Sequence, residues 1–508
     1  MFSAGRVVDP APARVLATPA DFGALLGAAR QRREGDAHAR LLEANMRMLR
    51  DASGSISTGP AAARGALRAG ISANQPVGTI VPMKVPNVGG FLTGGVNYCN
   101  DNFPISARIV YNGSKAIILE DVAASLAGQM DTLFQKVGQE FDNVMYEIVR
   151  INFGDPLRMD DLLDGNGKII MLFSPKINSF SSIAGFVVSC DFQTATTSPS
   201  SNHAEVFYAV VPTDSGPDVT KNATRAGWYR TIRSTIVHEV KHLAAFASRI
   251  RDFGSSLEDN WLEEGTARHA EELWARVGAY GGLEQRANAT YAMTLFCDVR
   301  PSKADAPQCA GKPYAMVRHF ESGGLYDYLR DNEQRSPLGP KTGFPESSFY
   351  GSAWSLIRWA VDNSATDEAQ FLGALVRTSQ GGVANLVARV GRPWEEILGE
   401  WSLAMYLDDY PGFVSLNNTR LTFPSWNLRA IFAGLNQDFP TTFNVAYPLV
   451  PRNVAFGDFN AQVSKVAGGS FAMFQLSGVQ TGRQLLQLLS PNGGEPGSKL
   501  RVAIVRIE

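Results

Sequence analysis

The sequence contains no uninterrupted apolar run that approaches the roughly 18 to 20 residues needed to cross a bilayer, so we expect no transmembrane segment. It also lacks long blocks of one charge, because 47 lysines and arginines are interspersed with 49 aspartates and glutamates. No concentrated basic surface is therefore predicted, and nucleic acid is not an expected partner. Hydrophobic residues make up 44% and charged residues 19%, which is typical of a folded globular protein.

Cysteine is scarce, and the four cysteines show no C-x-x-C spacing, which argues against a zinc site made of thiolates. The sequence leaves open whether these cysteines are free thiols or form disulfides. The segment from Cys297 to Cys309 holds two prolines and no helical period, so a disulfide there would close a loop in an oxidising compartment. Residues 1–20 lack the charged start and apolar stretch of a secretory signal. We expect either an intracellular protein or an export signal outside this sequence.

The pattern along the 508 residues predicts an α+β protein of several units. Residues 1–75 are expected to be an N-terminal helical region or pro-segment. Residues 76–409 should form the main domain, with a β-rich part to about residue 226 and a helical part over 227–409. Short apolar runs separated by Gly, Pro and Asn in residues 410–508 predict a C-terminal all-β, sandwich-like module.

The segment HEVKH places His238 and His242 four residues apart on a predicted helix. Residues with this spacing share one helix face, so both imidazoles can bind one cation. Glu239 follows the first histidine and is predicted to be the general base that takes a proton from water. Two incidental histidines on a solvated helix are the alternative interpretation.

A second helix, DNWLEEGTARHAEELWARV, follows at a distance that allows the chain to turn back. Glu264 is the candidate third ligand, because two histidines and a glutamate leave a fourth position for water, as in catalytic zinc sites. Its neighbour Glu263 is expected to be an exposed acid of the first turn. Glu271 lies seven residues beyond Glu264 and is predicted to orient a zinc-bound histidine. His269 is interpreted as structural or exposed.

WLEEGTA resembles the Trp-Leu-Asn-Glu-Gly-x-Ala segment of the gluzincin metallopeptidases, with Glu in place of Asn. The resemblance implies Zn²⁺ as cofactor, Glu264 as ligand and a thermolysin-like domain with a mixed sheet and a helical subdomain. It also implies that Tyr350, in SSFYGSAWSLIRWAVD, stabilises the oxyanion. A core tyrosine at a helix start is the alternative. Lys241 departs from the family pattern, which usually has an uncharged residue there, and it is expected to face solvent.

The order of segments over residues 107–409 is most similar to the hyicolysin family within that clan. The resemblance implies a secreted or periplasmic metalloprotease, a hydrolase that acts on polypeptides. No Gly-x-Met-Glu-Asn segment for a substrate amine occurs, which favours an endopeptidase. Substrate is expected to pair with HAEVFYAVV as an edge strand. The competing hypothesis is a catalytically silent binding protein whose C-terminal module binds a surface ligand.

Two weaker signals carry no site. DDLLDGNGK, residues 160–168, lacks the full ligand set and the terminal glutamate of a calcium loop, so a plain turn is expected. No G-x-S-x-G motif for a serine nucleophile occurs.

Overall fold

The fold was analysed in a computed structural model of the chain. The structure describes residues 37–50, 70–180, 183–214, 224–254, 258–300, 306–321, 323–339, 348–413, 418–455, 466–478, 482, 486–490 and 493–507. Within these ranges no helix is both long enough and apolar enough to cross a membrane.

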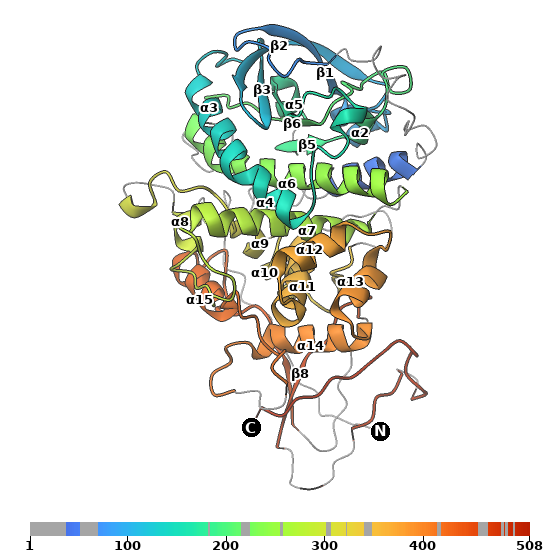
Figure 1. Ribbon diagram of the computed structural model, residues 1–508. Helices are drawn as coiled ribbons and strands as arrows, with labels where there is room; N and C mark the ends of the chain where they lie inside the picture. The colour runs from blue at the N-terminus through green and yellow to red at the C-terminus, as the bar shows by residue number, and fades with distance from the viewer. Residues whose placement is uncertain are drawn as a thin grey trace.

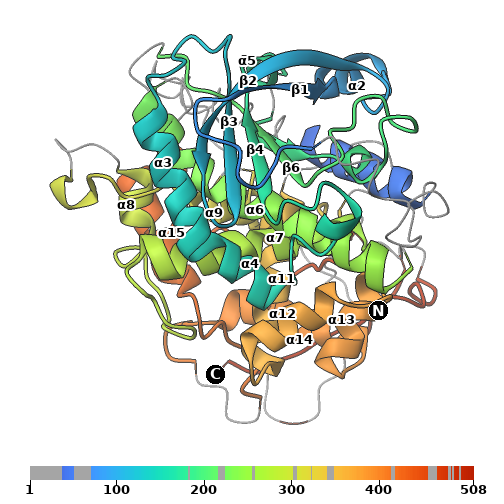
Figure 2. The ribbon, with the colours of Figure 1, turned by 45° about the horizontal axis from the view of Figure 1, so that its top comes forward.

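A mixed six-stranded sheet forms the upper layer of the molecule in Figure 1. Its strands are β1 (Ile80–Pro86), β2 (Asn102–Asn112), β3 (Ala116–Asp121), β4 (Ile169–Phe173), β5 (Gly185–Val187) and β6 (Val206–Ala209). Their order is β1-β2-β3-β4-β6-β5, with β3, β4 and β6 parallel, as Figure 2 shows, and the other pairs antiparallel. Every residue of AIILED and IIMLF is buried, and the apolar runs AIIL and IIMLF are typical of strands that are covered on both faces.

Helix α6 (Arg225–Asp252) packs against β5 and β6 of this sheet. Beside it run α3 (Asp131–Glu140), a π turn (Phe141–Met145) and α4 (Tyr146–Asn152). The aromatic rings of Phe134, Phe173 and Trp228 meet in edge-to-face or tilted contacts, with centroids 5.0 to 5.5 Å apart. Two short helices, α2 (Val88–Gly94) and α5 (Pro175–Asn178), lie near the sheet.

The remaining helices lie on the far side of α6 from the sheet (Figure 1). They are α7 (Asn260–Trp274), α8 (Leu295–Val299), α9 (Val317–Phe320), α10 (Leu325–Arg330), α11 (Phe349–Ser364), α12 (Glu368–Val376), α13 (Gly382–Val390), α14 (Trp394–Leu407) and α15 (Leu428–Asp438). Helix α7 contacts both α6 and α11. A Cβ added at Gly265 would lie 2.5 Å from Ile357 Cδ1 and 3.3 Å from the Ala353 carbonyl carbon, so glycine permits the close approach of α7 and α11.

The predicted C-terminal sandwich is not present among the described residues of 410–508. This region instead contains α15 and two short strands, β7 (Arg452–Ala455) and β8 (Phe474–Ser477), which pair in parallel. The sequence LRAIFAGL places Leu428, Ile431, Phe432 and Leu435 on one helical face, and all four are buried in the main core. An apolar helix that packs on the main domain was mistaken for part of a separate β unit, whereas the α+β arrangement itself is confirmed.

The carboxylate of Glu272 holds α7, α11 and the C-terminal region together. It accepts hydrogen bonds from the indoles of Trp354 (2.7 Å) and Trp426 (2.9 Å) and pairs with Arg358 at 3.1 Å. Glu272 and Arg358 are completely buried, so each compensates the charge of the other in a site that water does not reach.

We predict that Glu272→Gln lowers the melting temperature. The change removes one negative charge from beside a buried arginine, and breaking such a pair typically costs about 3–5 kcal/mol. Arg358 keeps Asp362 at 2.9 Å, so the loss should fall toward the lower end of that range. Calorimetry should show no comparable shift for Glu395→Gln, an exposed acid on α14. Equal melting temperatures for wild type and Glu272→Gln would contradict this role.

Candidate metal centre

Helix α6 directs His238 and His242 into one buried space. Thr224 caps the helix, because its side chain accepts a hydrogen bond from Gly227 N, and nearly every residue from 227 to 250 is buried. One helical turn separates the two histidines, and their ring centroids lie 5.0 Å apart. Their side chains are 8% and 1% exposed, so both rings sit inside the protein rather than on a solvated surface.

Helix α7 brings Glu264 to these histidines. Glu264 Oε2 lies 3.2 Å from His238 Nε2 and 3.9 Å from His242 Nε2. Ligands bound tetrahedrally at about 2.0–2.1 Å from zinc are about 3.3–3.4 Å apart, so these separations approximate those of a zinc site. Glu264 Oε2 and His242 Nε2 are buried without a hydrogen-bond partner. Such buried atoms are costly unless a ligand satisfies them, and this donor set fits zinc.

A carboxylate lies behind each histidine. His238 Nδ1 is 2.7 Å from Glu271 Oε1, and His242 Nδ1 is 2.8 Å from Glu263 Oε1. Burial raises the pKa of Glu263, but Lys241 and His242 together have the larger, opposite effect and bring the pKa down to about 2. Burial likewise raises the pKa of Glu271, whereas Arg268 and His238 lower it to about 2. Ionised carboxylates only accept hydrogen bonds, so Nδ1 of each ring donates and Nε2 keeps a lone pair for a metal.

Two expectations about this region are wrong. Glu263 is not an exposed first-turn acid, and Lys241 does not face solvent; both are buried, with Lys241 Nζ 2.8 Å from Glu263 Oε1. Lys241 also donates to the Glu263 backbone carbonyl at 3.0 Å. A lysine buried on a helix requires a buried partner of opposite charge, and that partner comes from α7.

Glu239 lies beside the same space. It is 2% exposed, and its Oε2 atom has no hydrogen-bond partner in the described structure. Its Oε1 atom lies 2.9 Å from Nε2 of His38, a histidine that also contacts Glu264.

Tyr350 stands at the start of α11 and is buried. The Arg268 guanidinium lies over its ring, 5.2 Å from the centroid, and donates to Glu271 at 3.0 Å. Tyr350 is thereby connected through Arg268 and Glu271 to His238. His269 is completely buried, with Nδ1 3.2 Å from Glu272 Oε2, and is structural rather than exposed.

An unpredicted residue, His38, enters the group from the helix at residues 37–50, drawn in dark blue near α6 in Figures 1 and 2. His38, His238, His242 and Glu264 each offer a ligand atom within 4.8 Å of the others. His38 Nδ1 lies 2.9 Å from Glu264 Oε1, and its Nε2 lies 2.9 Å from Glu239 Oε1. No local spacing connects residue 38 with residue 238, so the sequence held no pattern from which to predict this contact.

All four cysteines are paired. Cys297 bonds to Cys309, the pairing that the proline-containing loop allowed, and Cys99 bonds to Cys190. The second bond joins segments 91 residues apart, which sequence spacing alone could not indicate.

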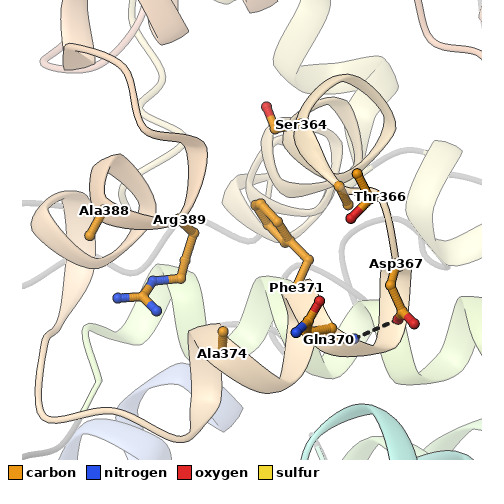
Figure 3. Close-up of a pocket in the computed structure, with 9 residues that line it drawn as sticks. Ser364, Thr366, Asp367, Gln370, Phe371, Ala374, Ala388 and Arg389 are labelled. Carbon is orange, nitrogen blue, oxygen red and sulfur yellow. Dashed lines mark hydrogen bonds between the residues drawn. The ribbon is translucent and has the colours of Figure 1, made fainter.

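A separate surface cavity of about 290 Å³ lies between the end of α11, α12 and α13 (Figure 3). Phe371, Gln370 and Arg389 are among the residues that line it. Asp367 at its rim already accepts a hydrogen bond from Gln370 N at 2.8 Å, as the cap of α12. None of the four residues of the His/Glu group lines this cavity, so it is distinct from the candidate metal centre.

Comparison with known proteins supports a distant relation to metalloproteases. The chain is 27% identical over 196 residues to the neutral metalloprotease ShpI of Staphylococcus hyicus. The match covers 38% of this chain and 41% of ShpI, so the chain spans about two-fifths of that relative. No family model matches the chain. The relation and the His/Glu group are together compatible with a zinc peptidase.

We predict that zinc bound by the purified protein is lost in His242→Ala. The variant removes one of the four candidate ligand groups and should weaken zinc binding, so after dialysis the zinc content measured by atomic emission should fall from about one ion per chain toward zero. The matched control is His203→Asn, because residue 203 has a positive φ of 53°, which asparagine tolerates. Zinc retained at full stoichiometry by His242→Ala would contradict this assignment.

Proposed function

We propose that this protein is a zinc-dependent metalloendopeptidase. The observation that carries the proposal is the approach of His238, His242 and Glu264 around unpartnered buried atoms, with Glu239 alongside. The distant relation to ShpI supports a protease. His238, His242 and Glu264 would hold the metal, and Glu271 and Glu263 would fix the two imidazoles from behind.

The protein groups divide the chemistry between them. A bound zinc ion would supply Lewis acidity toward the scissile carbonyl and the attacking water. Glu239 takes the proton from that water and then donates it to the leaving amine. Tyr350 is assigned as a hydroxyl donor to the negative charge that develops on the carbonyl oxygen, a contribution typically worth about 2.7–4 kcal/mol.

The strand that was expected to pair with the substrate does not lie at an edge of the sheet. β6, from HAEVFYAVV, is not an edge strand, because it lies between β4 and β5. Beyond it, β5 forms one edge of the sheet and contacts α6, which carries the two histidines. We assign β5 as the strand to which an extended polypeptide adds its backbone. Such pairing needs no free amino terminus, which favours an endopeptidase.

The two disulfides favour an oxidising location, so we assign the protein to the periplasm or the extracellular space. The alternative, a catalytically silent binding protein, is less well supported for two reasons. The ligand group and Glu239 are intact, and the described C-terminal residues do not form the separate β module that was expected to bind a surface.

The test is the hydrolysis of casein by proteins that differ only at residue 239. Both carry His38→Ala, because His38 lies against Glu239. Glu239→Gln should abolish cleavage, with a loss of at least about 100-fold, and leave the zinc content unchanged, because the amide cannot accept the proton. A third protein, with Glu284→Gln at an exposed acid in the same His38→Ala background, is the control and should cleave normally. Undiminished cleavage by Glu239→Gln would refute the proposal.

A further inference from the structure

The helix at residues 37–50 is packed into the body of the protein and is not a detached arm. Its buried apolar residues are Ala37, Ala39, Leu41, Leu42, Ala44, Met46 and Leu49, and all belong to the main core. Met48 Sδ lies 3.1 Å from Cys99 Sγ, within the Cys99–Cys190 disulfide. The helix is therefore held in a fixed position beside the candidate metal centre.

His38 stands where a fourth ligand would be. Two histidines and one glutamate leave one corner of a tetrahedral zinc site open. The His38 ring lies 5.3 Å from the His238 ring and 5.6 Å from the His242 ring, close to the 5.0 Å between those two rings themselves. Its side chain is only 16% exposed. Three imidazoles thus surround one point at similar spacing, together with Glu264.

Two turns further along the same helix, Asn45 covers the edge of β5. Its Nδ2 atom donates to the Val187 carbonyl at 2.9 Å, and its Oδ1 atom accepts from Ser189 N at 2.9 Å. Val210 N, directly after β6, donates to the Ala184 carbonyl, directly before β5. Backbone hydrogen bonds alternate between the two sides of a strand in an antiparallel pair, so the Val187 carbonyl and Ser189 N point away from β6. These outward groups are the ones that an added peptide strand would use.

We propose that the 37–50 helix is an inhibitory segment, in which His38 supplies the fourth metal ligand and Asn45 blocks the substrate strand. This inference rests on the proposed function. The helix is part of the same chain, so a peptide substrate competes against a high effective concentration of the inhibitor. With His38 bound, the corner that water and the scissile carbonyl require is filled.

The test uses the full chain loaded with cobalt(II), whose visible spectrum reports its ligands directly. His38→Ala should change the visible bands, increase the relaxation of solvent protons as water enters the metal corner, and raise casein hydrolysis by at least about tenfold. Asn45→Ala should keep the wild-type spectrum and lower the KM for peptides. Glu43→Ala, exposed on the same helix, should change none of these properties.

His38→Cys separates ligation from simple packing. A thiolate at this position should bind the metal, produce a cobalt–thiolate charge-transfer band and keep hydrolysis low. A spectrum that is identical in wild type, His38→Ala and His38→Cys would overturn the inference, even if the enzyme cleaves casein. Conversely, spectral changes at residue 38 without hydrolysis by any variant would support the ligand assignment and refute the peptidase proposal.

A second, independent cluster joins Asp160, Asp164 and Glu205, whose carboxylate oxygens lie within 4.8 Å of one another. Glu205, directly before β6, is completely buried, and neither of its oxygens has a hydrogen-bond partner in the described structure. Among the described residues, no arginine or lysine forms an ion pair with Asp160, Asp164 or Glu205. Burial and the neighbouring carboxylates raise the pKa of Asp164 to about 7 and raise the pKa of Glu205 as well, so the three groups all ionise at neutral pH only when a cation joins them.

The loop already holds its two aspartates in place. Asp160 Oδ1 accepts from Gly167 N at 2.9 Å, and Asp164 Oδ2 accepts from the Asn166 side chain at 2.6 Å. DDLLDGNGK thus forms the turn that was expected, and a third carboxylate, from a residue far along the sequence, lies beside it. The glutamate that the local pattern lacked comes from residue 205.

We infer that this cluster binds a calcium ion. An all-oxygen carboxylate set selects hard divalent cations. Calcium is favoured over magnesium because magnesium keeps several waters in a strict octahedron, whereas Glu205 lies where water has little access. The site would fix the 160–168 loop, which Arg158 and Arg251 connect to the end of α6.

Calcium titrations by calorimetry, with zinc saturating, test this inference. Calcium should raise the melting temperature of wild type by at least ~2 °C and magnesium should not. Glu205→Gln should melt above metal-free wild type, because it removes repulsion, and lose the calcium shift. Asp160→Asn should also lose the shift, while Asp101→Asn, an exposed control, should keep it. An unchanged calcium shift in both cluster variants, or a response to magnesium alone, would overturn the inference.

Discussion

The candidate centre depends on the two hydrogen bonds that connect His238 to Glu271 and His242 to Glu263. In them the Nδ1–H group of each ring donates to a carboxylate, which leaves both Nε2 atoms directed toward Glu264. Both carboxylates come from α7, so one helix supplies the proposed third ligand and the supports for the other two. The geometry of the site therefore requires α6 and α7 to keep a single relative position.

Buried charge fixes that position more than surface shape does. Lys241 compensates Glu263 within the α6–α7 interface, and Arg358 compensates Glu272 where α7 meets α11. Such pairs contribute little net stability, but each strongly disfavours arrangements that separate the partners. Gly265 allows α7 and α11 to approach closely at the residue next to Glu264. Packing and electrostatics thus act on the same short segment of α7.

The sequence was most informative where the signal was local. A four-residue spacing predicted that His238 and His242 share one face, and the segment around Gly265 selected Glu264. The burial of Lys241, the interior place of β6 and the approach of His38 depend on segments far apart in the chain. No periodicity within one segment encodes them. The error at LRAIFAGL has another cause, because short apolar runs between breakers satisfy strand and helix patterns alike until packing decides between them.

The proposed metal enzyme depends on one coordination sphere. Zinc K-edge X-ray absorption of the full chain measures this coordination sphere directly. The account predicts four nitrogen or oxygen neighbours at about 2.0–2.1 Å with the outer-shell scattering of three imidazoles, those of His38, His238 and His242. Scattering without imidazole, or a protein that retains no zinc, would contradict it.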